Sequence, residues 1–385
     1  MAVHTVGVLS AGEMGSGVGS VLNQHGLRVL TWLDGRGART RERARDAGMV
    51  EVADLAKLVS EAQIVLSIVP PAVAPAIADG LANAVRATQA DVLIADCNAI
   101  APGTVRRIAS VVTASGARFA DAGIIGPPPT RPGNRFFTSG LGASELALLT
   151  EHGLDVRVLE GDVGKASALK MCYAALTKGL QALGTELFVA ARLLGVDDTL
   201  REQQARDMKL IVEYLERAIP TMIPKAYRWV GEMEEIARCF DEVGLPGATF
   251  DGFAEVYRRV TEADDAPVPE VLDRVADTAL LHRHVALFNE GVRSGNFEPM
   301  LSQFSDDADL VFEGVPAGPF HGRSAILDAY RQRPPDDEID LLEVRPHATE
   351  IEADYAWRRD GGQRAGRMIV EPAARQIKRL VVTLE

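Results

Sequence analysis

The stretch VGVLSAGEMGSGVGSVL, residues 6–22, determines how the first part of the chain folds. Its apolar beginning is typical of a buried strand, and the helical periodicity from residue 16 onward predicts a helix. Gly12 and Gly15 lie in the turn between the two. Gly12 would let a pyrophosphate approach the backbone, and Gly15 would let the helix pack closely on the strand. The helix N-terminus would offer its N–H groups to the phosphates.

The turn therefore predicts a dinucleotide site made by six consecutive residues: Ser10, Ala11, Gly12, Glu13, Met14 and Gly15. Ser10 stands where the pattern G-x-G-x-x-G has its first glycine, which weakens the tight-turn role of that position. A glycine-rich turn in another α/β fold is the alternative interpretation.

Three further apolar runs, at residues 28–33, 62–69 and 91–97, have the character of buried strands, and helical patterns lie between them. Near-continuous apolar strands that alternate with helices are typical of parallel sheets covered on both faces. We therefore expect an α/β fold with a Rossmann-type doubly wound sheet, in an NAD(P)-binding domain of residues 1–160.

The sequence after residue 160 divides into three segments that differ in composition and periodicity. Residues 161–262 show helical periodicity and no convincing strand, which predicts an all-α substrate and dimerisation domain. Residues 263–270 are acidic and hold two prolines, as expected of a linker. Residues 271–385 open with a helix and continue with strand-like pieces, which predicts a small α+β domain.

Composition excludes several classes of partner. The chain has 385 residues, is 47% hydrophobic and carries a formal net charge of −13. Because such an acidic chain repels phosphates, we expect no nucleic-acid partner. We also expect no membrane span, since no uninterrupted apolar run is long enough. Cys97, Cys172 and Cys239 are too scattered for a disulfide framework or a metal site, so we expect a cytoplasmic protein without a metal.

The residues that follow the second predicted strand bear on the choice between NAD and NADP. Asp34 can accept hydrogen bonds from both ribose hydroxyls, which favours NAD. Arg36, Arg39 and Arg41 follow at once, and guanidinium groups bind a 2′-phosphate well, which favours NADP. The arginines can equally form the solvated start of a helix, so the cofactor is predicted only as NADP or NAD.

Ligands of such sheets bind at the carboxyl ends of the strands. Val69 and Pro70 end the strand at 62–69 and are expected to lie over the ribose and the nicotinamide. Asn98 ends the strand at 91–97, and its amide offers both a donor and an acceptor. We predict that Asn98 contacts cofactor or substrate; a helix cap or a turn residue is the alternative.

Lys170 is the strongest candidate for chemistry, because it lies inside an otherwise apolar helix. Lysines are rarely buried without a function or a partner, and desolvation makes the amine a usable acid or base near neutral pH. Tyr173, Ala174 and Thr177 share its helix face, so Tyr173 and Thr177 are predicted substrate contacts. Lys178 is expected on a different face, as an ordinary residue. A lysine that snorkels at a helix edge is the alternative.

In their order along residues 1–260, these motifs resemble the β-hydroxyacid dehydrogenases. Gly7 to Gly15 looks like the nucleotide signature of that family, and Asp96 to Pro102 is similar to its D-x-S-T-x-x-P segment, with Asn98 in the place of serine. Gly161 to Lys170 resembles its G-x-x-G-x-G-x-x-x-K helix, whose lysine is catalytic. Tyr173 and Ala174 replace the asparagines that usually follow.

Phe119 to Gly126 is similar to the substrate loop of the family, which is usually written D-A-P-V-S-G-G. Here Gly123, Ile124 and Ile125 stand in the loop, and we predict them as substrate contacts. The departures, together with the run from Ile223 to Ala237, resemble a subgroup whose helical domain is known only as a domain of unknown function.

The resemblance implies an NAD(P)-dependent dehydrogenase or reductase that acts on CH–OH groups. The substrate would be a small hydroxyacid or its oxo or semialdehyde form, and Lys170 would be the general acid and base. Arg131 and Arg135 could hold the substrate carboxylate or could face solvent. Relatives dimerise through the helical domain, and the apolar helix from Lys165 to Leu194, with a break expected near Gly179 or Gly184, agrees with a homodimer.

Residues 271–385 resemble the cone-like fold of nuclear-transport-factor-2-like or SnoaL-like domains, on Phe288-Asn289, the stretch Phe320 to Ile326 and the closing strand. Such domains enclose an apolar pocket. The candidates for lining it, each also compatible with a core or surface position, are His284, Tyr330, Asp354 and Trp357. A non-catalytic dinucleotide-binding sensor or scaffold that carries this domain as a small-molecule-binding module is the alternative function.

Overall fold

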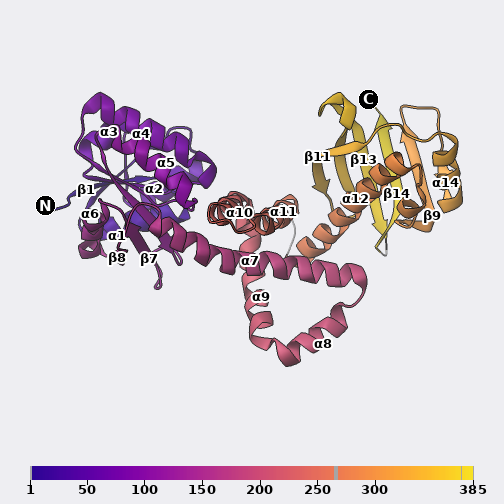
Figure 1. Ribbon diagram of the computed structural model, residues 1–385, viewed down its shortest axis with the longest axis horizontal. Helices are drawn as coiled ribbons and strands as arrows, with labels where there is room; N and C mark the ends of the chain where they lie inside the picture. Colours follow the sequence, from indigo (N-terminus) through magenta and orange to yellow (C-terminus); the bar gives the residue numbers. More distant parts are fainter. Residues whose placement is uncertain (1, 264–267, 374, 385) are drawn as a thin grey trace. The chain divides into compact units, whose positions relative to one another are not determined.

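The computed structural model describes residues 2–263, 268–373 and 375–384 (Figure 1). The chain forms two compact units. The first unit consists of Met1–Leu180 and Arg228–Ala254, and the second of Gln181–Tyr227 and Glu255–Glu385. Residues 264–267 of the predicted linker lie outside the described residues. The predicted domain limits at residues 160 and 262 stay predictions.

An eight-stranded sheet forms the centre of the first unit, in the order β3-β2-β1-β4-β5-β6-β7-β8. The strands are β1 (Thr5–Leu9), β2 (Arg28–Thr31), β3 (Val50–Glu51), β4 (Ile64–Ser67), β5 (Leu93–Asp96), β6 (Arg118–Ile125), β7 (Arg135–Ser139) and β8 (Val156–Val158). The six from β3 to β6 run parallel, whereas β7 pairs antiparallel with β6. This confirms the predicted Rossmann-like parallel sheet.

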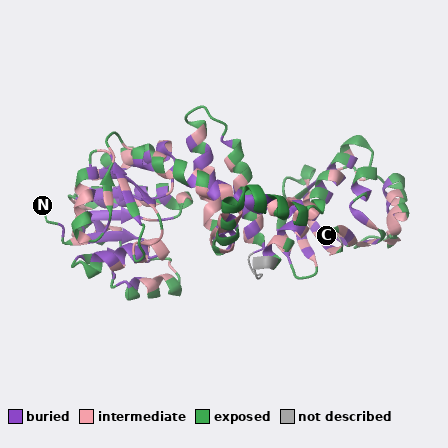
Figure 2. Ribbon diagram, turned by 90° about the horizontal axis from the view of Figure 1, so that it is seen from below, coloured by how far each residue is buried: buried purple, intermediate pink, exposed green. Residues whose placement is uncertain are grey.

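Two apolar cores, one on each face, hold this sheet. Val6 and Val8 of β1 pack with α1 (Glu13–Gln24) and α2 (Ala38–Asp46). Leu9 packs on the other face, with α3 (Leu55–Glu61), α4 (Ala74–Thr88) and α5 (Pro102–Thr113). Figure 2 shows the strands as buried ribbons between more exposed helices. Because the winding reverses between β1 and β4, the carboxyl ends of these two strands border the place where ligands bind in such sheets.

The helical segment contains α7 (Lys165–Leu194), α8 (Asp197–Asp207), α9 (Lys209–Met222), α10 (Ala226–Asp241) and α11 (Ala248–Glu262). The expected break of α7 near Gly179 or Gly184 is wrong, since α7 is one helix of 30 residues. Both glycines provide space instead. A Cβ at Gly179 would lie 3.2 Å from the Phe253 ring, and one at Gly184 would lie 2.6 Å from Leu215.

The second unit contains a mixed six-stranded sheet in the order β10-β9-β14-β13-β12-β11. The strands are β9 (Phe304–Glu313), β10 (Phe320–His321), β11 (Ile339–Pro346), β12 (Ile351–Trp357), β13 (Arg364–Ala373) and β14 (Gln376–Leu384). The helices α12 (Val268–Ser294), α13 (Glu298–Leu301) and α14 (Gly322–Gln332) share one apolar core with the sheet. The composition is the predicted α+β, and the kinship with cone-like domains stays a prediction.

In the described ranges, no helix is long and apolar enough to cross a membrane.

Candidate cofactor site and active site

The turn between β1 and α1 has an open outer side and a tight inner side. Gly12 is the N-cap residue of α1, and no heavy atom lies within 4 Å of a Cβ built on it. A Cβ on Gly15 would overlap the carbonyl oxygen of Ser10. The residues therefore fit a dinucleotide: Gly12 leaves room for a pyrophosphate, and the N-terminus of a 12-residue helix faces that room.

Glu13 adds a carboxylate to this turn, and two arginines approach it. Arg131 lies 3.5 Å from one carboxylate oxygen of Glu13, and Arg228 lies 3.8 Å from the other. The arginines therefore offset a charge that would repel phosphate. Arg135 lies elsewhere and pairs with Asp155 at 3.5 Å. Both predicted carboxylate-binding arginines, Arg131 and Arg135, are exposed and already have an acidic partner.

The residues after β2 that were predicted to decide between NAD and NADP have different surroundings. Asp34 is exposed and lines a hollow with Trp32, Arg41 and Glu51. Arg41 donates to the carbonyl oxygens of Leu33 at 2.8 Å and Arg36 at 3.3 Å, so it stabilises the loop. Arg36 is half-buried and Arg39 is exposed. Asp34 and Arg36 therefore remain the candidates for contacting the ribose.

Asn98 ties the carboxyl ends of β4 and β5 together. Its side-chain oxygen accepts a hydrogen bond from the Val69 backbone N–H at 2.7 Å. Its side-chain nitrogen donates to Asp96 at 2.8 Å and to the Ser67 hydroxyl at 3.3 Å. Burial raises the pKa of Asp96 to about 7. Asn98 thus orients the Val69-Pro70 segment, in which Val69 is buried and Pro70 exposed; a direct contact with a ligand stays a prediction.

The carboxylate of Asp121 attaches α7 to the sheet. Asp121 lies in β6, is fully buried, and accepts hydrogen bonds from the backbone N–H groups of Gly164 at 2.8 Å, Ala166 at 3.1 Å and Ser167 at 3.2 Å. The hydroxyls of Ser167 and Ser139 also donate to it, at 2.7 Å and 2.9 Å. An anion at the amino end of a helix is favourable, and this one determines where the first turn of α7 begins.

Lys170 follows one turn later and lies against β6. A Cβ on Gly123 would lie 3.0 Å from the Cβ of Lys170 and 2.8 Å from the carbonyl oxygen of Ala166. Gly123 is two residues beyond Asp121, which is in register with the ends of β4 and β5. The structure therefore brings Lys170 and Gly123, both predicted from the sequence as site residues, to one place. The expected loop at residues 119–126 is mostly strand β6, where Gly123 and Ile124 are buried and Ile125 half-buried.

Lys170 belongs to a cluster of charged side chains from α7 and α10. Burial lowers the pKa of the Lys170 amine, and the Glu232 carboxylate opposes this by raising it. Glu232 forms an ion pair with Lys178. Burial raises the pKa of Glu232, but Lys178, Lys170 and Arg228 outweigh it and hold the value below the usual range. The carboxylate is thus an anion that serves two lysines.

Lys178 differs from the expectation of an ordinary residue on another face. Its side chain is 11% exposed, and its ammonium lies 4.7 Å from the centre of the Trp229 ring. Burial lowers its pKa to about 8, against the opposing effect of Glu232. Tyr173 is 49% exposed, and the Thr177 hydroxyl donates to the Tyr173 carbonyl oxygen at 3.1 Å. Their predicted contact with substrate stays a prediction.

Helix α10, which supplies Glu232, is attached to the amino end of α5. Glu235 accepts hydrogen bonds from the Ala101 N–H at 2.8 Å and from the Thr104 hydroxyl at 2.9 Å. Glu242 accepts from the Gly103 N–H at 2.9 Å. Sequence reasoning missed Glu232 and Lys178, and their place depends on this long-range attachment. Within the described residues, no group of three or more His, Cys, Asp or Glu side chains could hold a metal ion.

Two family comparisons agree with this geometry. Residues 5–140 match the NAD binding domain of 6-phosphogluconate dehydrogenase. Residues 191–260 match a domain of unknown function, DUF1932. The first match covers the glycine turn and the strands β1 to β7, and the cofactor is accordingly NAD or NADP.

Three individual proteins are similar to the chain. An uncharacterised 28.5 kDa protein of Methanothermus fervidus is 30% identical over 197 residues, which are 51% of this chain and 74% of the relative. Conserved protein MTH1747, of unknown function and described as structurally similar to 3-hydroxyacid dehydrogenases, is 31% identical; the match covers 67% of this chain and 97% of that protein, with a TM-score of 0.51. A 3-hydroxyisobutyrate dehydrogenase of Mycobacterium tuberculosis shares the fold at 17% identity, over 71% of this chain and 99% of that enzyme, with a TM-score of 0.55. Over the part that these relatives match, the chain belongs to the β-hydroxyacid dehydrogenase family.

Proposed function

We propose that this protein transfers hydride between NAD(P) and a small hydroxyacid or its oxo or semialdehyde form, with Lys170 as the general acid and base. The single observation that carries the proposal is the desolvated amine of Lys170 on α7, beside Gly123 at the carboxyl ends of the strands. Ligands of doubly wound sheets bind at that edge. Membership of the family supports an NAD(P)-dependent hydroxyacid oxidoreductase.

In the proposed reaction, the cofactor accepts or supplies the hydride. On oxidation, the neutral Lys170 amine takes the proton of the substrate hydroxyl. On reduction, the protonated amine delivers a proton to the carbonyl oxygen. Because burial lowers the pKa of Lys170, the neutral form is populated closer to neutral pH than in a solvated lysine. Glu232 opposes this, so it keeps the protonated form accessible for the reverse direction.

The charge around Lys170 favours an acidic substrate. Lys170, Lys178 and Arg228 all act on the carboxylate of Glu232, and Arg228 also approaches Glu13, so these three cations outnumber the two carboxylates. A substrate carboxylate would balance that excess in surroundings where water screens little. The cationic cluster is therefore a better candidate for attracting the substrate than Arg131 and Arg135, which lie exposed beside other acids.

A non-catalytic dinucleotide-binding sensor or scaffold is the second candidate function. Its specific support is the cavity of the second unit, described below, which could serve as a binding module. A sensor does not require a desolvated amine beside the cofactor edge. The Lys170 substitutions below therefore separate the two functions.

Gly12→Glu tests the cofactor site. The position has open space and an extended backbone with φ of −68°, so the fold should tolerate a side chain there. The new carboxylate would meet the pyrophosphate, and we expect the affinity for both NADH and NADPH to fall at least about tenfold, or roughly 1.4 kcal/mol. Calorimetric titration measures this. Gly252→Glu, at another open position, is the matched control. Equal cofactor affinity in the Gly12 variant and the wild type would refute the site.

Lys170→Ala tests the proton transfer. We expect turnover to fall by at least about 100-fold, with nearly unchanged cofactor affinity, because general acid–base catalysis contributes roughly 10²–10⁴-fold. Lys170→Arg should not restore turnover, since guanidinium stays charged. Steady-state kinetics with a hydroxyacid found in a substrate panel provides the measurement. The exposed Lys165 on the same helix gives the control, Lys165→Ala. Wild-type turnover in Lys170→Ala would favour the sensor.

Glu232→Gln tests how the cluster sets the pH dependence. Oxidation requires the neutral amine, so its rate rises with pH through the pKa of Lys170. Glu232 raises that pKa, and therefore its neutralisation should lower it and move the acidic limb of the oxidation profile to lower pH. The pH profile of kcat/KM checks the direction. Glu234→Gln, about 200° around the same helix, is the control. A limb that stays in place or moves upward would show that it does not report Lys170.

We also propose that a second copy of the chain covers part of the helical segment, where α7 and α9 expose apolar side chains. Leu194 is 76% exposed and Leu210 is 81% exposed. Light scattering at micromolar concentration should give twice the chain mass of 41.3 kDa. Leu210→Glu should shift the protein toward the single-chain mass, whereas Leu141→Glu, at an exposed site of the first unit, should not. A wild-type mass of one chain would contradict the dimer.

A further inference from the structure

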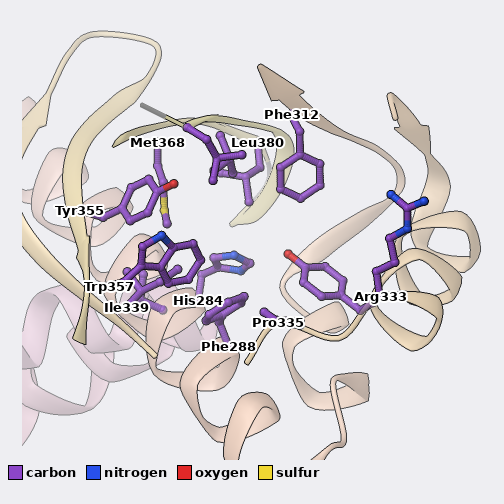
Figure 3. A pocket seen from close by; sticks show the side chains of 14 residues that line it. His284, Phe288, Phe312, Arg333, Pro335, Ile339, Tyr355, Trp357, Met368 and Leu380 are labelled. Atoms are coloured by element: carbon purple, nitrogen blue, oxygen red, sulfur yellow. The ribbon is translucent and has the colours of Figure 1, made fainter. Parts of the chain in front are cut away.

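The second unit encloses an apolar cavity of about 190 Å³ between α12, α14 and the inner face of its sheet (Figure 3). A second cavity of about 190 Å³ adjoins it and shares Phe312, Tyr330, Arg333 and Leu384 with it. Figure 3 shows aromatic and aliphatic side chains around an open central space. Walls of this kind suit a hydrocarbon chain or ring.

His284 brings a buried polar atom to this cavity. The side chain is 2% exposed, and its Nδ1 atom has no hydrogen-bond partner among the described residues. Burial lowers the pKa of His284 to about 4, so the ring is neutral at physiological pH. Leaving a buried nitrogen without a partner is unfavourable by roughly 1–3 kcal/mol. In Figure 3 the His284 ring faces the central space, and Tyr330 lines the same cavity, so an oxygen of a ligand could meet both side chains.

Arg333 places a positive charge at the edge of the two cavities. It is exposed and borders both cavities, and among the described residues that line them no other side chain is charged at neutral pH. The acidic side chains of the neighbouring loop are bound by other arginines: Asp336 and Asp337 by Arg359, and Glu338 by Arg293 and Arg358. A cation at the edge of an apolar lining is complementary to an amphiphile with an anionic head.

We propose that this cavity binds a small apolar carboxylic acid that carries a hydroxyl or keto oxygen on its chain. The carboxylate pairs with Arg333, the chain occupies the apolar walls, and the oxygen hydrogen-bonds to His284 and Tyr330. This site lies wholly within the second unit and does not depend on the proposed hydride transfer.

The full chain can be tested with 3-hydroxyoctanoate and with octane-1,3-diol, which differs by lacking the carboxylate. Trp357 lines the cavity, so its fluorescence should change on binding, and Trp357→Phe should lose the change. We expect saturable binding of the acid, at least about tenfold tighter than that of the diol. Arg333→Met should remove that difference, whereas Arg331→Met, on α14 and paired with Glu298, should keep it.

His284→Leu tests the second contact. It should weaken 3-hydroxyoctanoate at least about threefold and leave octanoate, which lacks the hydroxyl, unchanged in calorimetric titration. Thermal unfolding of Arg333→Met and His284→Leu is compared with that of the wild type, so that a loss of fold is recognised. If His284→Leu unfolds, Arg333→Met still tests the proposal, because Arg333 is exposed. The proposal is overturned if 3-hydroxyoctanoate shows no saturable binding at millimolar concentration, or if it binds no tighter than octane-1,3-diol. It is also overturned if both variants bind the acid as the wild type does, which is the result expected if the acid binds at Lys170 instead.

Discussion

The bond between the Asp121 carboxylate and the amino end of α7 is the contact on which the candidate active site depends. Three backbone N–H groups and two hydroxyls converge on this one buried anion. The helix N-terminus alone carries a partial positive charge, so the carboxylate both satisfies the unpaired N–H groups and offsets that charge. Since Asp121 belongs to β6, the sheet determines where α7 begins. The position of Lys170, one turn further along α7, therefore also depends on this contact.

A second set of hydrogen bonds attaches α10, the helix that carries Glu232, to the amino end of α5. Glu235 of α10 and Glu242, one residue beyond the end of α10, bind the amino end of α5, just as Asp121 binds that of α7. The two helices that carry the charged cluster are thus held by acids at helix N-termini, and both contacts lie in the first unit. Glu232 and Lys178 form their ion pair between these two helices. A carboxylate as little exposed as that of Glu232 would be unfavourable without these cations, so the cluster depends on both attachments.

The strands β1, β2, β4 and β5 followed from local sequence, because each lies in an apolar run and the glycine turn lies between a strand and a helix. The buried strand β6 did not, since it contains Asp121 and the sequence suggested a loop there. Motifs in the sequence named Lys170 and Gly123 separately as candidates, and the structure places them side by side. Lys178 was misjudged: eight residues at 3.6 per turn place it only about 80° from Lys170, close enough to share a carboxylate. Nothing local indicates that this carboxylate is Glu232, 54 residues beyond Lys178. Asn98 shows the same limit. The sequence does not reveal that both polar atoms of the Asn98 side chain are hydrogen-bonded to Val69, Asp96 and Ser67.

In each unit burial lowers the pKa of one titratable group, Lys170 in the first and His284 in the second, but the charges around the two groups differ. Lys170 is desolvated, yet an anion within its cluster keeps both of its protonation states accessible, as a residue that takes and returns a proton requires. His284 is desolvated with no opposing charge, so it stays neutral through the physiological range and can only donate or accept a hydrogen bond. The presence or absence of a buried counter-charge thus separates a candidate for chemistry from a candidate for recognition. In a chain whose net charge is −13, the excess of cations around Glu232 is local, and it can attract an anion only over the few ångströms in which screening is weak.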